Sequence, residues 1–82
     1  ERKEINRSIS RLEKQIAEIE VRIAQLEKDI ASTDQFMAEH PEKVDAALFT
    51  RYEEVKKELD RELHNWEKLQ YELEIWNEKK TW

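Results

Sequence analysis

Glycine is absent from this chain of 82 residues, and proline occurs once, as Pro41. Because glycine and proline interrupt most other architectures, their scarcity predicts long, uninterrupted helices. Cysteine is also absent. That absence excludes disulfides and thiolate metal sites, and it suits a reducing compartment such as the cytosol.

Long apolar runs are missing as well, since no stretch approaches the ~20 residues that a membrane-spanning helix needs. No apolar secretory segment precedes the first helical pattern. The chain opens inside that pattern, at Glu1-Arg2-Lys3-Glu4, without an initiator methionine. We therefore expect residues 1–82 to form one domain that is a fragment of a larger protein without contact to a membrane.

Charged residues make up 43% of the chain and hydrophobic residues 38%, with a net charge of −5. A chain this short and polar cannot bury a thick core, but two helices can share one narrow apolar seam. The mildly acidic balance does not favour nonspecific attraction to nucleic acid, although a local basic face can still contribute.

Apolar residues recur at alternating steps of four and three from residue 5 to residue 30. This spacing is the 3.5-residue repeat of a coiled coil. Position a of the repeat falls at Ile9, Ile16, Ile23 and Ile30, and position d at Ile5, Leu12, Ile19 and Leu26.

A second repeat follows Pro41, and one of its positions is polar. Glu62 falls at d, with Leu63 beside it at e. We expect Leu63 to replace it in the seam through irregular helix geometry near residues 61–65. The apolar positions of this run are Leu48, Tyr52, Val55, Leu59, Trp66, Leu69, Leu73 and Trp76.

Together the two repeats predict an all-α fold, a two-helix antiparallel coiled-coil hairpin. We expect helices at about 2–33 and 42–80, joined by a turn at about 34–41. Pro41 suits the first position of a helix. Asp34 could cap one extra turn, in which Phe36 and Met37 would close the seam. At ~1.5 Å per residue the hairpin would be roughly 45–55 Å long.

Flanking charges favour one register among those that the seam allows. In this register Ile30 faces Leu48, and Ile23 faces Val55. Three pairs of opposite charge then flank the seam: Glu27 with Lys56, Arg22 with Glu58, and Asp29 with Arg51.

Catalytic and cofactor-binding patterns are missing from the sequence. A phosphate-binding loop needs glycine, and the two histidines, His40 and His64, lie far apart in the sequence. Neither histidine belongs to a metal-binding motif or stands beside a nucleophile with an orienting carboxylate. We therefore expect no catalytic residue, metal or cofactor in this domain.

Basic residues form a stripe on the outer face of the second helix, and others lie on the first helix. Such residues could contact the phosphates of a nucleic acid. The alternative is an ordinary solvated face, since Glu18, Glu54, Glu58 and Glu72 share that side. The candidate nucleic-acid-binding residues are Arg7, Arg11, Lys14, Lys57, Arg61 and Lys68.

Three tryptophans are many for so short a chain. We expect Trp66 in the seam and Trp76 at its open end. Whether Trp76 and Trp82 mediate self-association stays open, and we expect a monomer. Small residues recur at position b, at Ser10, Ala17, Ala24 and Ala31, where they either let another surface approach or simply favour the helix.

Several features in order resemble the C-terminal coiled-coil domain of ABC-F ATPases of the Uup type. They are the isoleucine- and leucine-rich helix, the Ala31-Ser32-Thr33-Asp34-Gln35-Phe36 segment, His40-Pro41-Glu42-Lys43, and Asn65-Trp66-Glu67-Lys68-Leu69. Trp66, Glu67 and Leu69 match an Arg-Trp-Glu-x-Leu-Glu stretch of that family, whereas Asn65 and Gln70 depart from it.

The resemblance implies a soluble, cytoplasmic parent protein that binds and hydrolyses ATP in other domains and acts in translation. It implies a non-catalytic arm that contacts DNA or ribosomal RNA or steadies the ATPase domains of the same chain. A purely structural spacer, or a hairpin for protein–protein interaction, is the alternative.

Overall fold

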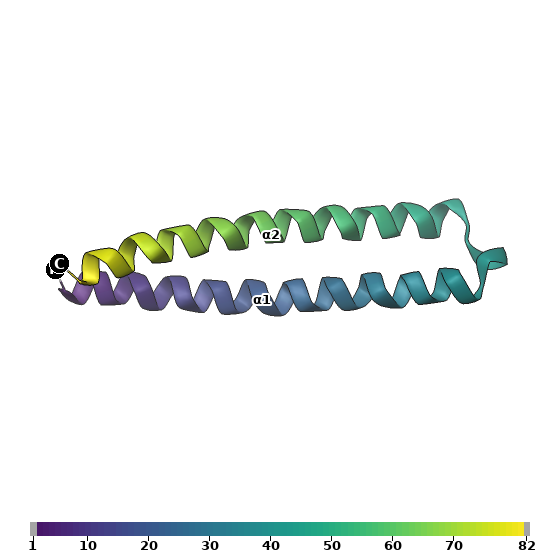
Figure 1. Ribbon diagram of the computed structural model, residues 1–82. Coiled ribbons are helices and arrows are strands. Elements are labelled where there is room, and N and C mark those ends of the chain that lie inside the picture. Colours follow the sequence, from purple (N-terminus) through teal and green to yellow (C-terminus); the bar gives the residue numbers. More distant parts are fainter. Residues whose placement is uncertain (1, 82) are drawn as a thin grey trace.

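Two long helices lie side by side and antiparallel in the computed structural model, which describes residues 2–81 (Figure 1). Helix α1 spans Arg2–Glu39, the 3₁₀ helix η1 spans Pro41–Lys43, and helix α2 spans Ala46–Lys80. The predicted all-α helical hairpin is therefore confirmed. Its long axis measures 61 Å and both short axes 14 Å, so the hairpin is longer than predicted.

The first helix is longer than the sequence suggested, and this accounts for the extra length. We expected a turn at 34–41, but α1 continues to Glu39 because nothing in residues 34–39 breaks a helix. It ends where Pro41 disfavours helical geometry at His40, whose φ is −132° and ψ is 61°. Pro41 occupies the first turn of η1, as its position predicted.

The second helix begins at Ala46 rather than at residue 42, because its cap is Asp45. The Asp45 carboxylate accepts a hydrogen bond of 2.8 Å from the backbone N–H of Leu48. This satisfies one of the donors that a helix start leaves free. Asp34 does not cap a turn; its carboxylate accepts a hydrogen bond from the Tyr52 hydroxyl across the seam.

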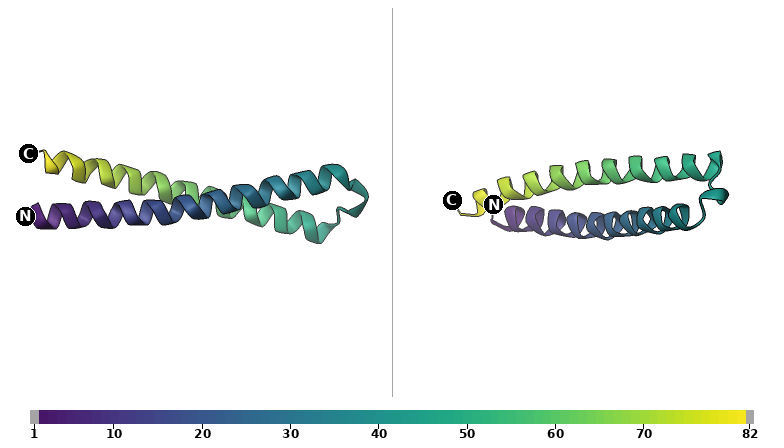
Figure 2. Two further views of the ribbon diagram at one scale, coloured as in Figure 1. Left: turned by 90° about the horizontal axis from the view of Figure 1, so that it is seen from below. Right: turned by 45° about the vertical axis from the view of Figure 1, so that its right-hand side comes forward.

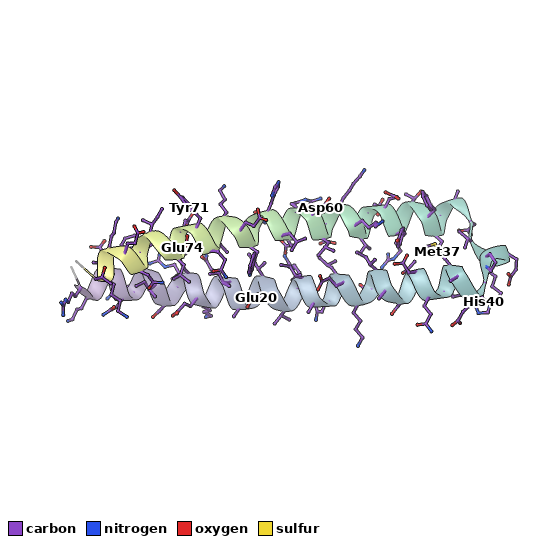
Figure 3. All side chains as sticks on the ribbon, in the orientation of Figure 1. Glu20, Met37, His40, Asp60, Tyr71 and Glu74 are labelled. Atoms are coloured by element: carbon purple, nitrogen blue, oxygen red, sulfur yellow. The ribbon has the colours of Figure 1, made fainter. Side chains whose placement is uncertain are left out.

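The seam follows the two heptad repeats along the length of the hairpin. The helices cross near their middle, as expected for helices that wind around each other (Figure 2). The buried hydrophobic residues within 2–81 all come from α1, at positions a and d: Ile9, Leu12, Ile16 and Leu26. Near the turn, half-buried Met37 extends the seam (Figure 3). Phe36 is exposed and packs against His40.

The register differs by one heptad from the predicted one, which was wrong. Hydrogen bonds between the helices join Arg22 to Glu62, Glu20 to Trp66, and Asp34 to Tyr52. The residue numbers in these pairs sum to between 84 and 86, whereas the predicted register requires sums near 78. Ile30 thus lies level with Val55, and Ile23 with Glu62. The three predicted flanking pairs are not among the ion pairs of residues 2–81.

Glu62 explains why the register is shifted. It is the buried charged residue of α2, only 7% exposed, and α2 continues through it without the irregularity that we predicted at 61–65. A buried carboxylate requires a cationic partner. In the observed register Arg22 lies beside it, whereas in the predicted register Gln15 would take that place.

Candidate interaction surface

The hairpin has two long sides that differ in charge. In an antiparallel pair, positions e of both helices flank one edge of the seam and positions g flank the other. Positions b and e therefore share one side, which we call the acidic side. Positions c and g share the opposite side, which we call the mixed side, and positions f lie on the outer backs of the helices.

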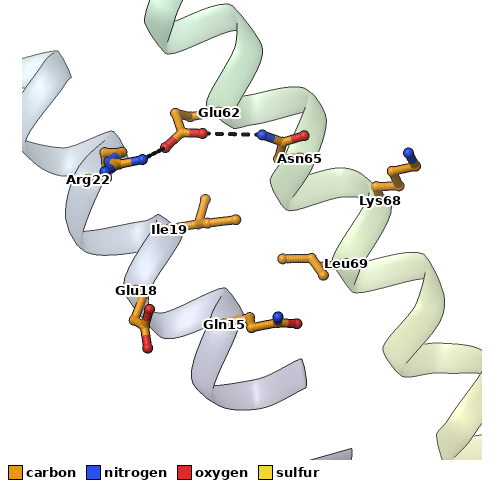
Figure 4. A pocket seen from close by; sticks show the side chains of 8 residues that line it. All are labelled: Gln15, Glu18, Ile19, Arg22, Glu62, Asn65, Lys68 and Leu69. Carbon is orange, nitrogen blue, oxygen red and sulfur yellow. Dashed lines mark hydrogen bonds and ion pairs between the residues drawn. The ribbon is translucent and has the colours of Figure 1, made fainter. Parts of the chain in front are cut away.

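A groove of about 360 Å³ opens on the mixed side near its middle (Figure 4). Ile19 and Leu69 face each other across its floor. Polar and charged residues form the remainder: Gln15, Glu18, Arg22, Glu62, Asn65 and Lys68.

An ion pair closes one end of this groove. The Arg22 guanidinium donates to Glu62 Oε2 at 2.9 Å, and the Asn65 amide donates to Glu62 Oε1 at 3.2 Å (Figure 4). The Glu62 side chain is 9% exposed, whereas that of Arg22 is 64% exposed. Both carboxylate oxygens are thus satisfied at the seam, while most of the arginine stays in solvent.

This pair shifts the acid–base behaviour of both partners. The hydrogen bond from Arg22 holds the pKa of Glu62 below its ordinary value, against the opposing effect of burial. The bond from Asn65 and the charge of Arg61 act in the same direction. The same hydrogen bond raises the pKa of Arg22, so both groups remain charged near neutral pH.

The six candidate nucleic-acid-binding residues are all exposed, and the heptad positions divide them into two sets. The first set, at position c, faces the mixed side and consists of Arg11, Arg61 and Lys68. The second set, at position f, lies on the outer backs and consists of Arg7, Lys14 and Lys57.

The structure does not gather these six residues into one cluster. The predicted register would put Arg11 level with residue 67, beside Lys68. In the observed register Arg11 lies level with residue 74, so the cations of α1 lie one heptad nearer the open end than we predicted. Arg22, which was not among the candidates, instead shares the central groove with Lys68.

Aromatic side chains donate to carboxylates along the acidic side. Trp66 Nε1 donates to Glu20 at 3.1 Å, and the Tyr52 hydroxyl donates to Asp34 at 2.5 Å. The bond to Asp34 is the main cause that raises the pKa of Tyr52. Lys56 Nζ lies 4.8 Å from the Tyr52 ring centre.

The tryptophans follow the predicted pattern where the structure describes them. Trp66 is half-buried in the seam, and Trp76 is half-buried near the open end, with Lys79 Nζ 4.4 Å from its ring centre. Trp82 lies outside the described residues. Tyr71 is 66% exposed and points outward from the back of α2 (Figure 3).

Neither histidine forms part of a metal-binding cluster. Among residues 2–81, no group of three or more histidine, cysteine or acidic side chains is placed to hold a metal. His40 and His64 lie 3.7 Å and 3.9 Å from Glu42 and Glu67, respectively. No helix of the described part is long and apolar enough to cross a bilayer.

Sequence reasoning missed the pairing of Arg22 with Glu62, although a signal for it was present. Glu62 occupies a seam position, and Arg22 is the cation at position g of the first helix. Among registers one heptad apart, the observed register is the one that brings these two residues together.

The family model for the ABC transporter C-terminal domain matches residues 1–71. The chain belongs to this family. Searches of curated proteins and of solved structures gave no significant match. The ABC part of the expected resemblance is therefore confirmed, and the hairpin is the C-terminal domain of an ABC protein.

Proposed function

We propose that this ABC transporter C-terminal domain is a non-catalytic arm of an ABC-F-type ATP-binding protein. Its mixed side would contact the phosphate backbone of DNA or ribosomal RNA. The arm would act as a monomer in the cytoplasm, next to the ATP-binding domains of the same chain. The ABC-F assignment rests on the Asn65–Leu69 stretch together with the family match.

One observation carries the nucleic-acid part of the proposal. Arg11, Arg61 and Lys68 are exposed on the mixed side, which is the one of the two long sides where acidic residues do not outnumber basic ones. Over residues 10–38 and 46–77, positions c and g hold five cations and five carboxylates. The cations are Arg11, Arg22, Arg51, Arg61 and Lys68, and the carboxylates are Glu18, Asp29, Glu54, Glu58 and Glu72.

Long, exposed cationic side chains reach phosphates without a deep pocket, and such contacts supply most sequence-independent affinity. Repulsion is weaker on this side than on the acidic side, where carboxylates predominate. Of the two long sides, the mixed side therefore opposes the approach of a nucleic acid less.

The two sets of candidate residues provide a matched test. One variant changes Arg11, Arg61 and Lys68 to glutamate, and the control changes Arg7, Lys14 and Lys57 to glutamate. Both carry the same change in net charge. Fluorescence anisotropy would measure the binding of duplex DNA and of a ribosomal RNA fragment between low and physiological salt.

We expect the position-c variant to bind at least tenfold more weakly than the position-f control at low salt. The slope of log affinity against log salt should fall by about two to three, because each lost phosphate contact removes roughly 0.9. Absence of binding by the unchanged hairpin, or equal losses in both variants, would refute the proposal.

The alternative is a purely structural spacer, favoured by the 61 Å length and the net charge of −5. A spacer depends on length and not on surface charge. Deleting one heptad from each helix at matching levels would then impair the parent protein, while both glutamate variants would leave it unaffected.

A further inference from the structure

The acidic side differs from the mixed side in both charge and apolar exposure. Over residues 10–38 and 46–77, positions b and e carry eight exposed carboxylates and one cation, Lys56. The carboxylates are Glu13, Glu20, Glu27, Asp34, Glu53, Asp60, Glu67 and Glu74. Much of the negative charge of the chain therefore lies on one side.

An apolar groove lies in the middle of this side. It has a volume of about 230 Å³ and is lined by Ile23, Ala24, Leu63 and Trp66, with Glu20 and Glu27 at its rim. Leu63 is 37% exposed even though the seam runs beside it. Glu62 occupies the seam position, where its ion pair with Arg22 stabilises it. Leu63 therefore lies outside the seam, at the edge of the groove.

The apolar surface continues toward the turn. A second groove, of about 410 Å³, has Ile30 and Leu59 in its lining, and its charged residues balance in sign: Glu53 and Asp60 against Lys56 and Lys57. Phe49 follows at position e and is 51% exposed. Leu63 and Phe49 are 14 residues apart, which is about 21 Å along a helix, or four turns.

We propose that the acidic side is a docking surface for a basic amphipathic helix from a protein partner. The apolar stripe of that helix would cover Leu63 and Phe49. Its flanking lysines and arginines would face the carboxylates on both rims, notably Glu27 of α1 and Asp60 of α2. The small side chains Ala17, Ala24 and Ala31 let the third helix approach α1 closely.

Charge disfavours the other occupants of this surface. A second copy that docked through its own acidic side would bring carboxylates against carboxylates, and a nucleic acid or an anionic membrane would bring phosphates against them. A helix with cations beside an apolar stripe satisfies both the rim and the floor of the groove. This surface is distinct from the mixed side, so the proposal does not depend on nucleic-acid binding.

A labelled 21-residue peptide with a leucine–alanine stripe flanked by lysines serves as the probe. A peptide of the same composition in scrambled order, which lacks the stripe, is the control. Fluorescence anisotropy of each peptide with the 82-residue hairpin measures binding. We expect the patterned peptide to bind at least tenfold more tightly than the scrambled one.

Two matched pairs of hairpin variants then locate the site. Leu63→Gln is compared with Ile75→Gln, because both residues are 37% exposed on α2 but lie on opposite sides. Glu27→Gln with Asp60→Asn is compared with Glu54→Gln with Glu72→Gln, which removes two charges from the mixed side. Circular dichroism confirms that each variant is folded.

We expect the acidic-side variants to weaken binding at least fivefold and the mixed-side variants to change it less than twofold. Equal losses on both sides, or equal binding of the scrambled peptide, would show nonspecific charge attraction and overturn the proposal. A dimer in sedimentation equilibrium that Leu63→Gln abolishes would also overturn it, since a second copy would then be the occupant.

Discussion

The same two helices form both sides of the hairpin, but the contacts between the helices differ from one side to the other. On the mixed side a buried carboxylate meets an arginine, and opposite charges balance. On the acidic side two aromatic donors reach carboxylates, and negative charge accumulates. The difference indicates that the mixed side determines how the helices align, whereas the acidic side offers unpartnered surface.

The comparison also separates two kinds of exposed apolar residue. Leu63 lines a groove on the acidic side, and Phe49 is exposed at the same heptad position nearer the turn, whereas Ile75 lies on the mixed side among balanced charges. Single exposed apolar residues are common on protein surfaces, but aligned ones beside a groove mark contact sites. The exposed apolar residues that could contact a protein partner are therefore more continuous on the acidic side.

The largest expected effect comes from the seam, which both sides share. Ile16→Ala truncates a residue that is 6% exposed and should lower the free energy of unfolding by about 2–5 kcal/mol. Urea denaturation followed by circular dichroism measures the change. Val21→Ala is the control, because Val21 is 60% exposed and its truncation should have little effect. Similar losses in the two variants would contradict the seam as described.

Replacing Glu62 tests the role of the mixed side in alignment. Glu62→Leu should raise the free energy of unfolding by about 1–3 kcal/mol, because an apolar side chain replaces a buried charge. It should also allow the helices to slide by one heptad.

Cysteine crosslinking measures that sliding, since the natural chain contains no cysteine. Ile30→Cys with Val55→Cys reports the observed register, and Ile30→Cys with Leu48→Cys reports the predicted one. With Glu62 present, only the first pair should form a disulfide readily. With Glu62→Leu both should form, and a single register in that variant would disprove the role of Glu62.

The two sides should respond to opposite extremes of pH. Glu62 has a lowered pKa, so its contribution to stability is present above its ordinary pKa near 4.5 and is lost as the pH falls through the folded value. Tyr52 has a raised pKa, so its contribution is present below about pH 10 and is lost as the pH rises through the folded value.

Thermal unfolding across pH checks both directions. Glu62→Gln should flatten the acid limb alone, and Tyr52→Phe the alkaline limb alone. The acid effect should be the larger, because Glu62 is buried and Tyr52 is only half-buried. The prediction fails if either variant alters the opposite limb.

The smallest expected effect concerns the hydrogen bond from Trp66 on the acidic side. Trp66→Phe retains an aromatic ring in the seam but removes the donor to Glu20, and should cost about 0.5–1.5 kcal/mol. In a Glu20→Ala background the same change should cost less, because the acceptor is already absent. Equal costs in the two backgrounds would mean that the bond contributes nothing.

The heptad pattern was sufficient to predict the hairpin but not how its helices align. Eight regularly spaced residues from Ile5 to Ile30 predict the first helix, because a sustained period of 3.5 residues is typical of coiled coils. Every register one heptad apart satisfies that period equally. Exposed charge pairs, each worth only ~0.2–1 kcal/mol, favoured the wrong register. The cationic partner that buried Glu62 requires is the stronger constraint, and it selects the observed one.

Features that depend on a single helix could be predicted from the sequence, whereas features that depend on the register could not be predicted from the repeat. Asp45, three residues before Leu48, is a recognisable helix cap. The second helix was nevertheless predicted to start too early, because Pro41 suits the first position of a helix and in fact begins η1. Heptad positions correctly predict that Arg61 and Lys68 share a side, because that depends on one helix only. The level of Arg11 relative to them depends on the register, so the sequence pattern alone could not predict it.

Glu62 has a further consequence for how the chain folds. Two helices with a nearly uniform repeat can pair in a wrong register during folding, and each such pairing would be a kinetic trap if it were stable. In a wrong register the Glu62 carboxylate would be buried without a cation, which lowers the stability of that pairing. The helices would therefore separate before the remaining turns form. The hairpin should therefore refold in a single exponential phase. A charge near the middle of the seam thus prevents misaligned helices from persisting during folding.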